Sequence, residues 1–135
     1  DYEKKILNKK TFLKFKKNVL QSKLDLHKIF SHLKKNRKKI FGISAPSRAT
    51  TLINYVGINE DIIDCILEID GSKKIGKYLP GTKIPIKNEN IVLKENPEYL
   101  IIFSWHIYKE IISNLKKKGY KGKFIIPLPK PKIIN

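Results

Sequence analysis

The sequence predicts an α/β fold in which helices cover both faces of a parallel sheet, preceded by a long amphipathic helix. Short apolar runs alternate with segments of helical periodicity, and this alternation is typical of parallel sheets. A hydrophobic fraction of 41% in 135 residues suffices for one folded domain. No apolar run approaches the ~20 residues that a membrane span requires.

The first predicted element is a helix over residues 11–35, ended by Asn36 and Arg37. Its apolar residues recur every three or four positions and so share one face, with lysines behind it. They are Phe12, Phe15, Val19, Leu26, Ile29, Phe30 and Leu33. We expect residues 1–37 to form a linker helix and residues 38–135 one compact domain. Because the chain has no methionine, even at position 1, we expect it to be a fragment of a longer one.

The main strands are predicted over residues 38–44, 62–70, 98–104 and 122–129, with a short additional strand over 83–86. The prolines in the last of the four favour an edge position or an exit from the sheet.

Helices are predicted between these strands. Residues 48–56 turn Leu52, Ile53 and Val56 inward and end at Gly57 as a C-cap. Residues 88–96 form one or two helical turns that Pro97 stops. Residues 106–118 form an amphipathic helix closed by Gly119, with an apolar face of Ile107, Ile111, Ile112 and Leu115. This succession of strands and helices indicates a Rossmann-like domain.

Charge and cysteine usage restrict the function classes. The net charge of +17 raises nucleic-acid binding as a possibility. The cations are almost all lysine, however, and only Arg37 and Arg48 are arginines, the residues that bind phosphate in a bidentate manner. A bias toward Lys, Ile and Asn across the chain explains the charge better. The single cysteine, Cys65, lies in an apolar run, which predicts a buried, inert thiol and fits a reducing, cytoplasmic setting.

Ligands of open α/β sheets bind beyond the carboxyl ends of the strands. This rule selects the loop Ala45, Pro46, Ser47 and Arg48, which leads into a helix whose N-terminus favours an anion. Arg48 can form a forked contact with phosphate, and hydroxyls such as Thr51 can donate hydrogen bonds. The alternative is that Ser47 is only an N-cap and Arg48 only a solvated cation.

Other candidate residues follow the later strands. Asp70 stands where nucleotide-binding folds often place a ribose-binding acid, although acids also begin turns. The segment "KYLPGTKIPI" is rich in turn formers, and its Tyr78 could stack on a ring or belong to a structural crossover. Trp105 and His106 follow the third main strand; Trp105 could be a core or lid residue, and His106 could simply open its helix.

Four stretches in this order resemble the C-terminal domain of bacterial S-adenosylmethionine-dependent C-methyltransferases, which act on nucleotide-linked deoxysugars. They are "GISAPSRATTLINYVGI", "GKYLPGTKIPI", "PEYLIIFSWHIYKEI" and "GKFIIPLP". The first corresponds to a Gly-x-Gly-Ala-Pro-Ala-Lys-Gly-Asn-Thr-Leu-Leu-Asn-Tyr pattern of the family. The resemblance covers nearly the whole chain.

The resemblance implies a three-part enzyme with a zinc-binding head, a methyltransferase core that holds S-adenosylmethionine and the base, and this tail, which grips a dTDP-type nucleotide sugar. The tail alone is then expected to be inactive. Its partners are the nucleotide sugar and the upstream domain, without a membrane. The substrate-binding residues that it implies are Ala45, Pro46, Ser47, Arg48, Thr51, Asn54, Asp70, Lys77, Tyr78, Thr82, Trp105 and His106.

The chain also departs from the family pattern. Ser47, Ala49 and Thr50 replace the usual loop residues, and Ser104 stands where a proline is usual. These departures put the base and the sugar in doubt more than the fold. Two alternative functions stay open: a basic nucleic-acid-binding module, and a structural or interaction domain without a ligand. A lysine stripe on one face would favour the first, whereas a scatter of lysines would not.

Overall fold

The computed structural model describes residues 2–135, except for the side chains of Leu7 and Arg48. One sheet has the strand order β3-β2-β1-β4-β5-β6. The first five strands run parallel to their neighbours, and β6 is antiparallel to β5. The α/β class predicted from the sequence is therefore confirmed. The strands are β1 (Ile40–Ile43), β2 (Ile66–Glu68), β3 (Ile86–Asn88), β4 (Tyr99–Ile102), β5 (Lys123–Ile126) and β6 (Lys132–Ile134).

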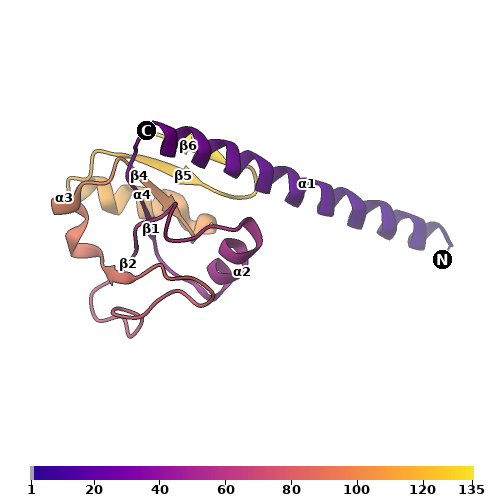
Figure 1. Cartoon of the computed structure of the whole chain (residues 1–135). Coiled ribbons are helices and arrows are strands. Elements are labelled where there is room, and N and C mark those ends of the chain that lie inside the picture. Colours follow the sequence, from indigo (N-terminus) through magenta and orange to yellow (C-terminus); the bar gives the residue numbers. More distant parts are fainter. Residues whose placement is uncertain (1) are drawn as a thin grey trace.

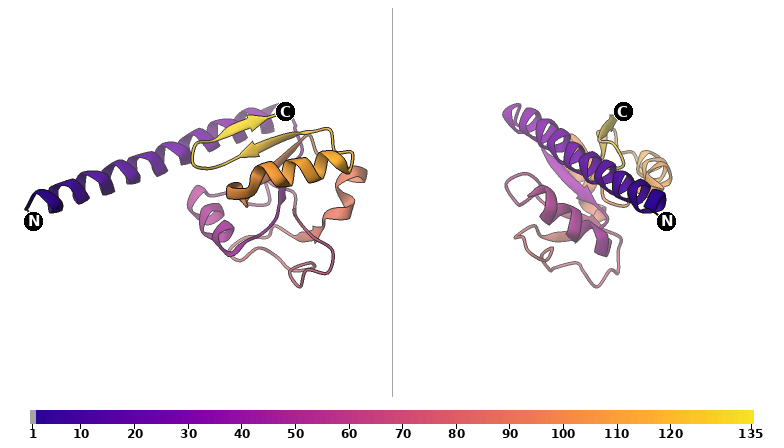
Figure 2. Two further views of the ribbon diagram at one scale, coloured as in Figure 1. Left: turned by 180° about the vertical axis from the view of Figure 1, so that it is seen from behind. Right: turned by 90° about the vertical axis from the view of Figure 1, so that its right-hand side faces the viewer.

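Helices cover both faces of this sheet (Figures 1 and 2). The helices α1 (Tyr2–Lys35) and α2 (Ser47–Val56) pack on one face, where Leu26, Phe30 and Ile53 enter the core. The other face carries α3 (Val92–Glu95) and α4 (Tyr108–Lys117). Two 3₁₀ turns precede these helices: η1 (Glu89–Ile91) and η2 (Trp105–Ile107).

The central strands are apolar on both faces because the helices bury both of them. Every residue of β1 is buried, and Ile40 faces the α1/α2 side while Phe41 and Ile43 face the α3/α4 side. Cys65 is also buried, and burial raises the pKa of its thiol to about 11. The predicted burial of this cysteine is therefore confirmed.

The first helix is longer than its apolar stripe predicts, and only part of the stripe reaches the core. Leu26, Phe30 and Leu33 are buried, whereas Phe12 and Phe15 are exposed. The sheet lies beside the C-terminal half of α1, and the N-terminal half extends beyond the domain (Figures 1 and 2).

The strand boundaries also differ in places. β2 spans only Ile66–Glu68, because the chain before it turns at residues 60–62. The short additional strand occurs as β3, at Ile86–Asn88 rather than 83–86. β5 is an interior strand, since β6 pairs with it and takes the edge. Pro127 and Pro129 follow β5, outside its hydrogen-bonded ladder.

The predicted helix ends are mostly correct. Gly57 caps α2 in the left-handed conformation with φ of 82°, and its N–H donates to the Ile53 carbonyl. In contrast, Ile107 is exposed although the periodicity placed it inward. The reason is that residues 105–107 form a tighter 3₁₀ turn, which rotates its side chain away from the face of Ile112 and Leu115.

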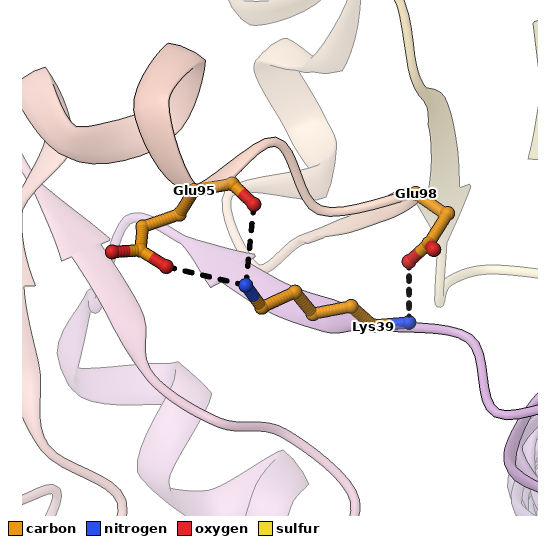
Figure 3. A network of polar contacts seen from close by, with 3 residues as sticks. All are labelled: Lys39, Glu95 and Glu98. Carbon is orange, nitrogen blue, oxygen red and sulfur yellow. Dashed lines mark hydrogen bonds and ion pairs between the residues drawn. The ribbon is translucent and has the colours of Figure 1, made fainter.

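Polar contacts anchor the amino ends of β1 and β4 (Figure 3). The Lys39 backbone N–H donates to Glu98 Oε2 at 2.6 Å. The Lys39 ammonium donates to the Glu95 carbonyl and to Glu95 Oε2, each at 3.2 Å. This network lies at the sheet edge opposite the candidate functional loops, so it is structural.

Candidate functional site

The sheet order brings the two predicted loops together at its carboxyl edge. The chain leaves β1 toward β2 on one side, while β4 pairs with β1 on the other, so the strand order reverses between β1 and β4. Such a reversal is where open α/β sheets bind ligands. Ser44 follows β1, Ser104 lies just beyond β4, and their hydroxyl oxygens are 2.7 Å apart. The loop that contains Arg48 and the turn that contains Trp105 therefore start side by side.

Close packing under this edge allows the two serines to meet. The Phe103 ring lies directly on Gly42, where an added Cβ would be 2.6 Å from the Phe103 Cε2 atom. Ser44 adopts a left-handed conformation with φ of 70°, unusual for a residue with a side chain. Its N–H donates to the Leu67 carbonyl at 2.7 Å. This turn directs the chain away from β1 into the loop ahead of α2.

Two charged side chains hold that loop. The Ala45 N–H donates to Glu68 Oε1 at 2.7 Å, and the Lys74 ammonium donates to the Ala45 carbonyl. Glu68 is the last residue of β2, and Lys74 belongs to the β2–β3 loop. Ala45 itself is buried. Two opposite charges thus flank the candidate phosphate-binding loop.

The N-terminus of α2 forms the rest of the loop. Pro46 occupies the N-cap position, so Ser47 is the first helical residue and not the cap. The Ala49 N–H donates to the Pro46 carbonyl at 2.8 Å, and the first turn carries no acid. The helix dipole there favours an anion. The predicted contact of the Arg48 side chain lies outside the described residues.

Thr51 and Asn54 are exposed on α2. The Asn54 amide donates to the Thr50 carbonyl at 2.7 Å and to the Pro80 carbonyl at 3.3 Å. Asn54 therefore joins α2 to the β2–β3 loop, which is a structural role.

The β2–β3 loop carries four further candidates. Asp70 accepts a hydrogen bond from the Asn88 amide at 2.8 Å, and Lys77 is exposed. The Tyr78 side chain is 64% exposed and thus available for stacking. The Thr82 hydroxyl donates to the Leu79 carbonyl at 2.9 Å and accepts from the Ile84 N–H at 3.1 Å. Thr82 thus stabilises the turn between buried Leu79 and Ile84.

Trp105 and His106 lie in η2, immediately after the serine contact. His106 is exposed. Trp105 is half-buried and lines a groove of about 620 Å³ with α1 and the Leu128–Pro129 segment. The tryptophan thus lies at the carboxyl edge, packs against the core on the α3/α4 face and borders α1 through this groove, whereas Ala45 belongs to the core on the α1/α2 face.

A second cavity, of about 290 Å³, opens beneath the two serines on the α4 face. Its apolar lining includes Ile43, Leu67 and Leu115. At its polar rim, the Lys118 ammonium contacts Glu89 at 2.7 Å. Ser44, Glu68 and Ser104 line the cavity as well, so it is continuous with the carboxyl edge.

Sequence reasoning missed Glu68 and Lys74, and it selected Asp70 as the acid that ends the second strand. The strand ends two residues earlier, which makes Glu68 the acid at the strand terminus. The signal was available in "CILEID", since the acid there follows the apolar run directly. Lys74 is one of many loop lysines, and nothing in the sequence distinguishes it.

Between residues 2 and 135, no three or more His, Cys, Asp or Glu side chains gather in a way that could hold a metal ion. None of the helices described there combines the length and hydropathy needed to cross a bilayer.

Comparison with known proteins gives one consistent result. A family model described as "C-methyltransferase C-terminal domain" matches residues 2–129. The chain belongs to this family. The C-methyltransferase NovU of Streptomyces niveus is 31% identical over 99 residues, which cover 73% of this chain and 23% of NovU. This C-methyltransferase C-terminal domain thus corresponds to less than a quarter of the length of that relative.

Proposed function

We propose that this domain binds the diphosphate and nucleoside of a nucleotide-linked deoxysugar, of dTDP type, for an S-adenosylmethionine-dependent C-methyltransferase. The observation that carries the proposal is the carboxyl edge. There the α2 N-terminus, the Ser44–Ser104 contact and the Glu68–Ala45–Lys74 clamp surround the reversal of strand order. Membership of a C-methyltransferase family supplies the reaction class.

The carboxyl edge and the β2–β3 loop each suit one part of such a ligand. The positive end of the α2 dipole, Ser47 and the cation of Arg48 favour the diphosphate. Lys77, exposed on the β2–β3 loop, adds a second cation. The carboxylates of Glu68 and Asp70 can accept hydrogen bonds from ribose hydroxyls. Tyr78 pairs with Pro85, just before β3, and so lies outside the carboxyl edge. Its exposed ring can stack on a base that reaches along the β2–β3 loop.

We assign S-adenosylmethionine, structural zinc and the base to the preceding part of such an enzyme, as the family resemblance implies, because this chain matches the C-terminal domain of the family. Deprotonation beside a sugar ketone would create the nucleophile there. The residues of this chain would hold and orient the substrate and take no part in proton transfer.

The two arginines offer a matched test. Thymidine diphosphate and thymidine are titrated into the chain, and binding is followed by ligand-observed NMR. We expect millimolar affinity for the diphosphate and weaker binding of thymidine. Arg48→Lys should weaken diphosphate binding several-fold, because lysine keeps the charge but loses the forked contact. Arg37→Lys, in the turn between α1 and β1, should leave it unchanged. Equal effects of the two substitutions would contradict the proposal.

The lysines form no single stripe of the kind that would favour nucleic-acid binding. They are dense on the N-terminal half of α1, and others lie on the β2–β3 loop, on α4 and on β6, that is, on both sides of the sheet. This scatter is the pattern expected from a composition bias. A binding constant for RNA that fell steeply with salt would restore the alternative.

A further inference from the structure

The projecting half of α1 exposes apolar side chains on two sides. An inner stripe of Phe12, Phe15 and Val19 continues the row that enters the core farther along, and Phe12 and Phe15 are 63% and 65% exposed. A second row, the outer stripe, lies on a different side of the helix. It consists of Tyr2, Ile6, Leu13, Leu20 and Leu24, all exposed.

A helix surrounded by water would have no apolar partner for the side chains of either stripe. The N-terminal half of α1 extends beyond the domain (Figures 1 and 2). A surface helix normally keeps one apolar face, toward its own core. Contiguous exposed apolar surface of this kind marks an interaction site. Apolar residues on two sides further indicate that the helix is enclosed by its partner.

The inner stripe leads into a groove on this domain. Phe15 and Val19 form one wall of the 620 Å³ groove, and Trp105 and Leu128 contribute to the other side. The Ser22 hydroxyl donates to the Pro129 carbonyl at 3.0 Å and so holds α1 against the segment after β5. The projecting helix and the groove therefore form one continuous apolar surface.

The charges disfavour a coiled-coil pair with a second copy of this chain. Ile6, Leu13 and Leu20 are seven residues apart, as in one position of a coiled coil. The other core position of that repeat would then fall on Lys9 and Lys16, which would face each other across a self-pair. The helix is also strongly basic here, with Glu3 as its one acid between residues 2 and 24. Its lysines there are Lys4, Lys5, Lys9, Lys10, Lys14, Lys16, Lys17 and Lys23.

We propose that the projecting half of α1, with the adjoining groove, docks a second folded domain of the same methyltransferase, one that is acidic around an apolar recess. The choice of this occupant rests on the proposed function and on the small share of NovU to which this chain aligns. The family is described as a C-terminal domain, and the 99 residues aligned with NovU cover only 23% of that relative. Trp105 lines the groove one residue after Ser104, so a domain docked there borders the carboxyl edge.

The test is amide hydrogen exchange of residues 2–24, measured in the 135-residue chain and in the complete methyltransferase polypeptide that carries it. We expect exchange at least tenfold slower in the complete polypeptide, with the protection reduced at high salt. Equal exchange in the two would overturn the docking surface. Sedimentation showing the isolated chain to be a dimer with the same protection would assign the surface to a second copy and overturn it as well.

Variants of each stripe make the test specific. Phe12→Gln with Phe15→Gln, and separately Leu13→Gln with Leu20→Gln, should abolish the protection in the complete polypeptide. The matched control is Leu93→Gln, since Leu93 is 50% exposed on α3, across the sheet. Protection that survives both stripe variants would contradict the proposal. Thymidine diphosphate binding should be unchanged in all three, so a loss of nucleotide binding and a loss of docking remain distinguishable.

Discussion

The packing of Phe103 on Gly42 gives the sharpest prediction about how the site is built. In Gly42→Ala, the new Cβ would be 2.6 Å from Phe103 Cε2 and 3.0 Å from Ile66 Cγ1. Ordinary contact begins at 3.4 Å, so the ring would have to move by about 0.8 Å. Phe103 is fully buried and β1 lies between two strands, so moving either the Phe103 ring or the β1 backbone costs free energy.

Overpacking of this kind destabilises the fold by about 1–3 kcal/mol, whereas replacing a glycine inside a strand by alanine stabilises it by about 0.5–1 kcal/mol. We therefore expect Gly42→Ala to lower the free energy of unfolding by about 1.5 kcal/mol. With a urea m-value of about 1–3 kcal/mol/M, the midpoint should fall by about 0.5–1.5 M. Urea unfolding followed by the fluorescence of Trp105 measures the change.

A double-mutant cycle identifies the cause. Phe103→Leu removes the outer atoms of the ring and on its own should destabilise the domain. In the Gly42→Ala background the same change should cost at least 1 kcal/mol less, because it relieves the contact. An unchanged midpoint in Gly42→Ala, or strictly additive effects in the cycle, would refute the packing argument.

Three further predictions concern stability and reactivity. Cys65 should resist thiol reagents in the native state, since its pKa is raised to about 11 by burial, and it should react on unfolding. The pKa of Glu98 is lowered by the hydrogen bond from the Lys39 N–H. Its contribution to stability should therefore be complete above the unfolded-state pKa and be lost as the pH falls through the folded-state value. In Glu98→Gln, urea midpoints should depend less on acidic pH. Ser22→Ala should cost about 1 kcal/mol by removing the hydrogen bond to the Pro129 carbonyl, and an unchanged melting temperature would count against that contact.

Much of the fold could be predicted because its signals are local. The apolar run of β1, the periodicity of α2 and the left-handed glycine at position 57 each depend on neighbouring residues. The carboxyl-edge loops were found for the same reason, since loops after strands follow from strand placement.

What the sequence did not reveal depends on distant contacts. The interior position of β5 requires β6, whose short basic segment gave no clear strand signal. Glu68 and Lys74 become important because they meet Ala45, which is far from both along the chain. Trp105 was grouped with the loop of Arg48, yet its ring lines the groove beside α1. The direction of a side chain at a strand end is set by the packing around it.

The most direct test of the account is amide chemical-shift mapping of the chain during a thymidine diphosphate titration. The account predicts that the largest shifts fall on residues 44–48, on the β2–β3 loop and on residues 104–106, with a single millimolar dissociation constant. The absence of shifts at millimolar diphosphate, or shifts confined to α1 and β6, would contradict it.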